Sequence, residues 1–302
     1  MTSSLEPIVV LSLLVGVIAA LIFVGVIVAL VLFAVRYRAG RGGSAQQIYG
    51  SQRLEIARTD APVIVLAVVI ALSVVTLERI GRGATFGSLE PPLHVTVIGH
   101  QWWFEFRYPG GAVTANEAHI PIGVPIELEL RSADVIHAFW VPELGPKKDM
   151  IPGQTNVLRL FTARPGIFGG ACSEFCGVEH AWMRIQIVAE SHRDFDQWLS
   201  SQAAARVAPS GPAADGEQVF LASVCVSCHA IRGTSASAAI GPDLTHVGSR
   251  ATIAGGVLTN DTAAMRSWLA DPQGYKPGSQ MPRVSLSDAA LDALVTYLEG
   301  LK

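Results

Sequence analysis

Two long apolar runs occupy the N-terminal part of the chain. Residues 8–35 carry no charge, and as a helix they would extend about 42 Å, which exceeds the ~30 Å hydrocarbon core of a bilayer. Residues 61–77 form a second run, about 25 Å long as a helix. The sequence TDAP before it indicates a helix start with Pro62 in the first turn. The two runs predict a transmembrane helical hairpin within residues 1–90.

Basic residues flank the two runs unequally. The segment between the runs contains five arginines: Arg36, Arg38, Arg41, Arg53 and Arg58. The segment before residue 8 contains no Lys or Arg. Because basic loops stay on the cytoplasmic side, we expect a two-pass protein with both termini outside. A cleaved signal peptide is the alternative for the first run, but the run is long for that role and no basic region precedes it.

The pattern changes from continuous to alternating after residue 90. Apolar and polar residues alternate, as in half-buried β-strands, in four segments: 93–99, 126–131, 156–161 and 184–189. Gly and Pro recur between these segments, and few stretches have a helical period. We therefore expect an all-β Greek-key sandwich at residues 91–206, with one short helix at 195–202.

A helical period returns in the C-terminal part of the chain. Residues 207–214 are rich in Ala, Pro and Gly, which is typical of a linker. The final segment has Ser287 as a candidate N-cap and an apolar face formed by Leu291, Leu294, Val295, Leu298 and Leu301. We expect an all-α domain at residues 215–302.

The composition agrees with a membrane protein and limits the classes of function. Hydrophobic residues make up 50% of the chain and charged residues 16%, which is too apolar for an ordinary soluble protein. The formal net charge of -3 gives no basis for nucleic-acid binding. The 4 cysteines form two local pairs, which favours ligand or attachment sites over a disulfide framework.

The second cysteine pair lies in the sequence CVSCH. Cys225, Cys228 and His229 have the spacing of a c-type haem site, where two thiols attach the porphyrin and the histidine binds iron. A redox dithiol would need a βαβ context, which the sequence does not predict. The favoured sixth ligand is Met281, and His246 is the alternative. A thioether ligand raises the haem potential, which favours electron transfer over oxygen binding.

The first cysteine pair lies in the sequence ACSEFCGVEHAWM, between two predicted strands. Cys172 and Cys176 are followed by His180 and Met183, and His137, at a predicted strand end, can reach the same loop. Two thiolates can bridge two metal ions, with one imidazole on each. Sulfur with imidazole selects copper, zinc or iron. A Cys₂His₂ zinc site is the main alternative, but the spacing and the methionine favour copper.

Together with GHQWWFEF, DVIHAFWVP and KKDMIPG, this motif resembles subunit II of the haem–copper respiratory oxidases. The resemblance extends from the first apolar run to about residue 189. The rest of the chain resembles a class I cytochrome c domain fused to that subunit. The resemblance implies a multi-domain membrane protein with a cupredoxin-like sandwich, and its dicopper (CuA) ligand positions would be His137, Cys172, Glu174, Cys176, His180 and Met183.

The resemblance also implies a role for each of these positions. Cys172 and Cys176 would bridge two copper ions, and His137 and His180 would each bind one of them. The weak axial ligands would be the thioether of Met183 and the backbone carbonyl of Glu174.

Three further site residues follow from the same resemblance. The Glu174 carboxylate would help bind a magnesium ion shared with subunit I. Trp102 matches an electron-entry tryptophan, with core packing as the alternative. Glu55 matches a glutamate at the mouth of a proton channel in subunit I, with a solvated charge as the alternative; Arg58 stands where the family usually has tryptophan.

The implied function is that of an electron-input subunit of a terminal oxidase in a bacterial inner membrane. Electrons would pass from covalent haem c to the dicopper centre and on to subunit I, which would reduce oxygen to water and translocate protons. Partners would be subunit I, other subunits, the lipid bilayer, and a quinol-oxidising complex or a soluble carrier as donor. The alternatives are the same input module on a nitric oxide reductase, and a membrane-anchored copper-binding or sensing protein.

Overall fold

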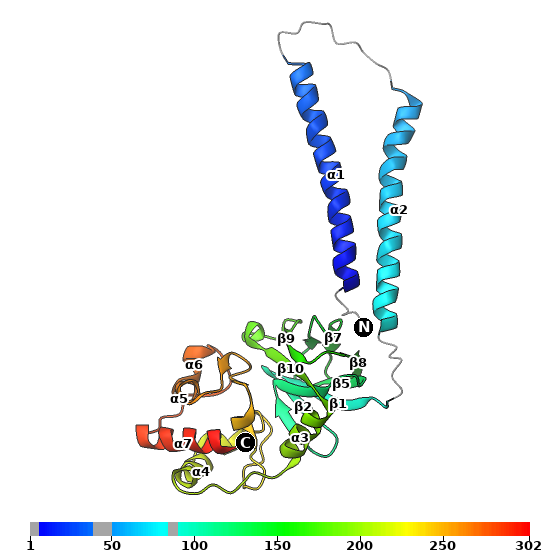
Figure 1. Cartoon of the computed structure of the whole chain (residues 1–302). Helices are drawn as coiled ribbons and strands as arrows, with labels where there is room; N and C mark the ends of the chain where they lie inside the picture. Colours follow the sequence, from blue (N-terminus) through cyan, green and yellow to red (C-terminus); the bar gives the residue numbers. More distant parts are fainter. Residues whose placement is uncertain (1–5, 39–49, 84–89) are drawn as a thin grey trace. The chain divides into compact units, whose positions relative to one another are not determined.

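The computed structural model describes residues 6–38, 50–83 and 90–302, in two compact units (Figure 1). The N-terminal unit contains helices α1 (Glu6–Arg36) and α2 (Gln52–Gly83). Both helices are long and apolar enough to cross a bilayer, over Pro7–Arg36 and Gln52–Glu78. Their apolar side chains are exposed, as expected for helices whose natural surroundings are lipid.

Helix α2 begins earlier than predicted. It starts at Gln52, and Pro62 lies inside it, so the prediction of a helix start at TDAP is wrong. The preceding residues are mostly good helix formers, and one proline removes a single backbone bond, which a long helix can tolerate at some cost. Glu55 therefore lies in the first turn of α2, and its proposed proton-channel role stays a prediction. Arg41 lies outside the described residues.

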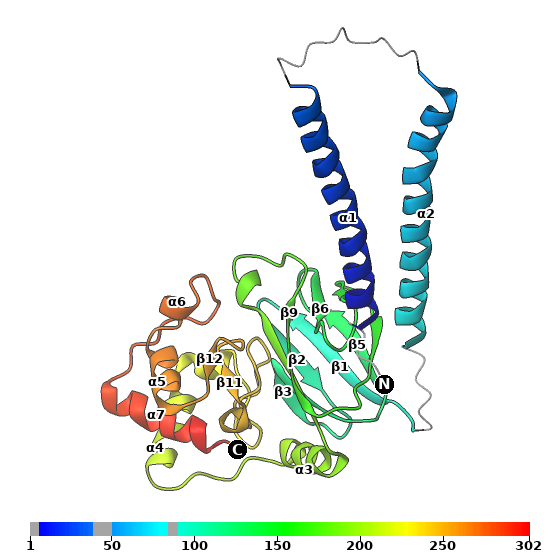
Figure 2. The same cartoon turned by 45° about the horizontal axis from the view of Figure 1, so that its top comes forward.

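The second unit begins with two five-stranded sheets (Figure 2). One sheet has the order β3-β2-β1-β5-β8 and the other β4-β10-β9-β6-β7. The strands are β1 (Leu93–His100), β2 (Trp103–Arg107), β3 (Val113–Ala115), β4 (Glu117–Pro121), β5 (Ile126–Ser132), β6 (His137–Trp140), β7 (Lys148–Met150), β8 (Asn156–Leu160), β9 (Gly166–Cys172) and β10 (Arg184–Glu190). The pairs β1–β5 and β4–β10 are parallel. The predicted β-sandwich is confirmed.

The alternating sequence pattern accounts for the sandwich core. In β1 and β5, residues such as Val95, Val97 and Leu128 are buried, while their neighbours in the strand point outward. Helix α3 (His192–Ala203) follows β10, and the Ser191 side chain caps it by accepting the Asp194 N–H. We call the two sheets together with α3 the sandwich domain.

The C-terminal part of the second unit, residues 212–302, is mostly helical and is called the helical domain. Its elements are α4 (Pro212–Ala222), η2 (Val224–Ser227), η3 (Val247–Ser249), β11 (Thr252–Ile253), β12 (Leu258–Thr259), α5 (Thr262–Ala270), α6 (Pro272–Tyr275) and α7 (Asp288–Gly300). Helix α4 begins inside the segment predicted as a linker, because Pro212 suits a first helical turn. The predicted cap of α7 is present, since the Ser287 side chain accepts the Ala290 N–H.

Candidate metal and haem sites

Paired strands hold the base of the first cysteine motif. Cys172 ends β9, His137 begins β6, and Met183 directly precedes β10. Strand β6 pairs with β9 so that Phe139 lies opposite Cys172, and the Cys172 N–H donates to the Met183 carbonyl at 3.0 Å. The short helix η1 (His180–Trp182) places His180 in the loop between β9 and β10. The candidate ligands thus lie at strand ends and on a loop that a rigid sheet supports.

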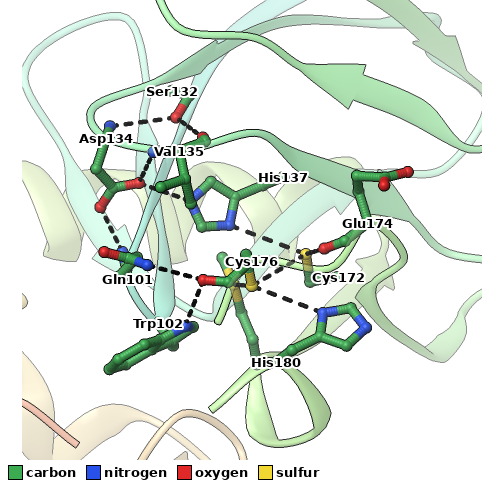
Figure 3. Close-up of polar contacts among 11 residues, drawn as sticks. Gln101, Trp102, Ser132, Asp134, Val135, His137, Cys172, Glu174, Cys176 and His180 are labelled. Carbon is green, nitrogen blue, oxygen red and sulfur yellow. Dashed lines mark hydrogen bonds and ion pairs between the residues drawn. The ribbon is translucent and has the colours of Figure 1, made fainter. Parts of the chain in front are cut away.

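Sulfur and imidazole atoms converge in this loop (Figure 3). The Cys172 and Cys176 Sγ atoms are 3.7 Å apart, and Cys172 Sγ is 3.9 Å from His137 Nδ1. Cys176 Sγ is 3.6 Å from His180 Nδ1 and 3.8 Å from Met183 Sδ. The ligand atoms of His137, Cys172 and Cys176 all lie within 4.8 Å of one another, and all three residues are buried.

These distances fit a metal centre better than a disulfide. A disulfide needs an S–S distance of about 2.05 Å, and both thiols are free. Metal–sulfur bonds of about 2.3 Å would span sulfur atoms 3.7 Å apart. The donor set of thiolate, imidazole and thioether also fits copper. These residues therefore fit the dicopper centre that the resemblance implies.

The two thiols lose their protons at different pH values. The hydrogen bond shared with Cys176, helped by the His137 imidazole, lowers the pKa of Cys172. The Cys172 thiolate beside it and burial raise the pKa of Cys176. A bound cation would favour removal of the second proton, because metal ligands bind in their deprotonated form.

Glu174 faces the thiols with its backbone only. Its carbonyl oxygen lies 3.2 Å from Cys172 Sγ, a position compatible with a weak axial ligand. Its carboxylate is exposed and points away from the sulfur atoms in Figure 3. The magnesium site therefore stays a prediction, since a shared ion would need groups from another chain.

Asp134 orients His137, although the sequence pattern did not point to it. Its Oδ1 accepts a hydrogen bond from His137 Nε2 at 2.8 Å, which leaves Nδ1 free on the side of Cys172. Its Oδ2 accepts the Gln101 N–H at 2.6 Å. The only sequence signal was an acidic residue three positions before a candidate ligand, and such a spacing is common by chance.

Trp102 contacts the same loop from the turn between β1 and β2. Its indole Nε1–H donates to the Cys176 carbonyl at 2.9 Å, and Gln101 Nε2 donates to the same oxygen at 2.8 Å (Figure 3). The tryptophan is thereby bonded to the backbone of a candidate copper ligand.

The second motif surrounds a cavity of about 390 Å³ in the second unit. Its lining includes the four candidate haem-binding residues: Cys225, Cys228, His229 and Met281. His229 Nδ1 donates to the Pro242 carbonyl at 2.8 Å, which leaves Nε2 free for an iron ion. Burial lowers the pKa of His229 and keeps the imidazole neutral. A Cβ at Gly241 would lie 2.6 Å from the His229 ring, so only glycine leaves the ring its place.

The rest of the cavity lining also fits a haem. Leu244, Met265 and Trp268 supply apolar surface. Arg250 lines the cavity and is buried. Among the described residues, its Nε has no hydrogen-bond partner. A buried cation with a free donor suits the carboxylate groups of a porphyrin.

The structure separates the two candidate sixth ligands. Met281 lines the cavity and His246 does not. His246 is buried instead, with Nε2 3.0 Å from the Ala204 carbonyl. The described geometry therefore favours the thioether, as the sequence did.

The sandwich domain completes the cavity. Gln101, Trp102, Trp103 and Asn116 line the same space as the candidate haem ligands. Trp102 therefore faces the haem cavity while its indole N–H is bonded to the Cys176 carbonyl. One side chain forms part of both candidate sites.

Comparisons with known proteins identify both domains of the second unit. Residues 110–191 match the family model described as cytochrome c oxidase subunit II, periplasmic domain, and residues 213–302 match cytochrome c. Over 282 residues the chain is 36% identical to cytochrome c oxidase subunit 2 of Alkalihalophilus pseudofirmus, covering 90% of this chain and 80% of that protein. Over 293 residues it is 33% identical to the Bacillus subtilis protein of the same name, covering 89% and 81%.

A crystal structure of the periplasmic domain of subunit II of cytochrome oxidase from Bradyrhizobium japonicum is 32% identical, with a TM-score of 0.37, and covers 38% of this chain and 96% of that one. The matched domains imply copper and haem binding, and with two candidate membrane helices they indicate a membrane protein. Given the identity to the relatives over most of its length, the chain belongs to the cytochrome c oxidase subunit 2 family of oxidoreductase subunits and carries a C-terminal cytochrome c domain.

Proposed function

We propose that this chain is the electron-input subunit of a terminal oxidase. It would pass electrons from covalent haem c to a dicopper centre and on to subunit I, which would reduce oxygen to water and translocate protons. The main support is Trp102, which lines the haem cavity and donates its indole N–H to the Cys176 carbonyl. When bound, the haem and the copper pair would each accept and release one electron.

The chain's own residues would hold the copper pair rigidly. Cys172 and Cys176 would bridge the ions, with His137 and His180 as terminal ligands, and Met183 and the Glu174 carbonyl in weaker positions. The β6–β9 and β9–β10 ladders support the bases of these ligands. Rigid ligands move little when charge changes, which keeps the reorganisation energy of electron transfer small.

Four residues of the cavity lining would hold the haem. Cys225 and Cys228 would attach it covalently, with His229 and Met281 as axial ligands. The hydrogen bond from His229 to the Pro242 carbonyl would set the orientation of the imidazole. Arg250 would supply positive charge for the porphyrin carboxylates.

We place four segments in the chain: a membrane hairpin at 1–90, the copper domain at 91–206, a linker at 207–214 and the cytochrome domain at 215–302. The proposed location is a bacterial inner membrane, with both metal domains on the external side. Arginines at the loop-side ends of α1 and α2 support this topology. Subunit I would be the direct partner, and a quinol-oxidising complex or a soluble carrier would be the donor.

Replacing Trp102 by Phe tests the electron path. The substitution keeps an aromatic ring but removes the donor to the Cys176 carbonyl. We expect electron transfer from haem to copper to slow by about fivefold, the factor that corresponds to a hydrogen bond of about 1 kcal/mol holding the ring in place. Flash-induced reduction of the holoenzyme, followed at the haem band and the near-infrared copper band, measures this rate.

The matched control is Trp140→Phe, an exposed tryptophan on β6 that does not line the haem cavity. It should transfer electrons at the wild-type rate. A Trp102→Phe enzyme that also does so would exclude this path, and loss of copper in that variant would assign Trp102 a structural role instead.

Replacing Asp134 by Ala should weaken copper binding. His137 would lose the acceptor that orients its Nδ1, and removal of such an outer partner typically lowers metal affinity by about 10–100-fold. Competition with a chelator on the full chain measures the affinity. Asp149→Ala, an exposed aspartate on β7, is the control, and equal affinities in the two variants would show that the Asp134 contact does not support the ligand.

A further inference from the structure

We propose that a buried ion pair between Glu179 and Lys276 holds the helical domain on the sandwich domain, so that Trp102 stays in the haem cavity wall. The consequence for electron transfer rests on the proposed function, whereas the contact itself does not. The haem would then reach the copper domain from a docked position, without repeated encounters on a flexible tether.

The pair joins the two segments that carry the candidate ligands. Glu179 lies in the copper loop, directly before His180, and Lys276 follows α6, five positions before Met281. Lys276 Nζ lies 3.1 Å from Glu179 Oε2, with the side chains 6% and 0% exposed. In the part of the chain that the structure describes, the Glu179 carboxylate has no hydrogen-bond partner besides Lys276. Lys276 therefore compensates this buried charge, and undocking would separate the two.

The surroundings are shaped to admit the lysine. Gly255, in the turn between β11 and β12, has a φ of +74°, and a Cβ there would lie 3.0 Å from Lys276 Nζ. The Gly255 carbonyl also accepts the Arg184 N–H at 3.3 Å, directly after the copper loop. A backbone hydrogen bond between Arg184 and Gly255 and the ion pair between Glu179 and Lys276 thus join the two domains at the copper loop.

Other bonds hold the contact on β4 and at the end of α3. The Arg232 guanidinium donates to the Ala203 carbonyl at 3.1 Å, at the end of α3. The Ala251 N–H donates to Glu117 Oε2 at 2.8 Å. Figures 1 and 2 show α6 at the upper side of the helical domain, whereas α3 lies lower in the view, below the sandwich sheets. Without the ion pair, the contacts on β4 and α3 would remain while the copper-loop end could open.

Hydrogen exchange of the holoenzyme tests this directly, because two amides bond across the contact. The Arg184 N–H reports the copper-loop end, and the Ala251 N–H reports the contact with β4. Lys276→Met removes the positive charge and leaves Glu179 buried alone. We expect exchange at Arg184 to rise by at least about 100-fold, because breaking a buried pair is strongly destabilising, with a smaller change at Ala251.

The redox readout separates docking from site damage. In Lys276→Met, electron transfer from haem to copper should slow, while the haem and near-infrared spectra keep their wild-type form. The double variant Lys276→Met with Glu179→Gln removes both charges, so it should recover most of the protection and of the rate. Arg266→Met is the control, because its pairs with Asp288 and Asp292 are exposed.

Wild-type exchange at Arg184 in Lys276→Met would overturn the proposal, as would raised exchange with an unchanged transfer rate. Failure of the double variant to recover would also overturn it. A chain that lacked copper or haem would sink the proposed function, but the exchange measurement would still decide whether the ion pair holds the domains together.

Discussion

A Cys176→Ser chain will hold at most one copper ion and will lose its near-infrared band. Serine supplies no thiolate, so Cys172 would be the one sulfur bridge candidate left beside His137, His180 and Met183. One thiolate, two imidazoles and a thioether form a mononuclear copper site. The affinity for a second copper ion should fall by at least about 100-fold. Loss of a direct ligand costs more than loss of a residue that only hydrogen-bonds to a ligand, which typically costs about 10–100-fold. Elemental analysis and near-infrared absorption of the purified holoenzyme measure both effects.

Val178→Ser is the matched control, because Val178 lies in the same loop and is exposed. It should keep two copper ions and the band. Two coppers in Cys176→Ser would exclude a bridging role for this sulfur. A single zinc ion in the wild-type chain would refute the dicopper proposal altogether.

Replacing both Cys225 and Cys228 by Ala will abolish covalent haem. Thioether bonds survive denaturation, whereas a haem held by His229 and Met281 alone dissociates when the domain unfolds. Haem staining after denaturing electrophoresis should fall from one haem per chain to background. Electron entry from the donor should fall with it, since the cavity would lose its stable occupant.

Ser227→Ala, between the two cysteines, is the control, because this exposed side chain makes no contribution to the cavity lining. It should retain the stained band. Covalent haem in the double cysteine variant would show that other residues attach it, and its absence from the wild-type chain would remove the donor site from the proposal.

Local patterns in the sequence predicted much of this protein. Local sequence was enough to predict the alternation in β1, β5, β8 and β10, the apolar spans, and the cap of α7 at Ser287. Each of these features depends on residues a few positions apart. Both cysteine motifs could be recognised in the sequence for the same reason. Ligands from one short loop or turn have a spacing that the backbone itself imposes.

The start of α2 was misread for a local reason as well. Pro62 is a common first-turn residue, but the helix formers before it extend the helix through the proline. The helix propensity of the residues before Pro62 favoured an earlier start, whereas the proline favoured a start at its own position. The propensity of the longer segment decided where the helix begins.

Contacts between distant segments were decided by the tertiary structure alone. The sequence could not predict that Asp134 accepts a hydrogen bond from His137 Nε2, or that His246 Nε2 is hydrogen-bonded to the Ala204 carbonyl. Nor could it predict that Trp102 borders both candidate sites, or that Glu179 meets Lys276. Spacing along a chain determines which groups can share a turn or a strand face. Which loops meet across a sheet or between domains depends on the packing of whole elements, for which a single sequence carries no local signal.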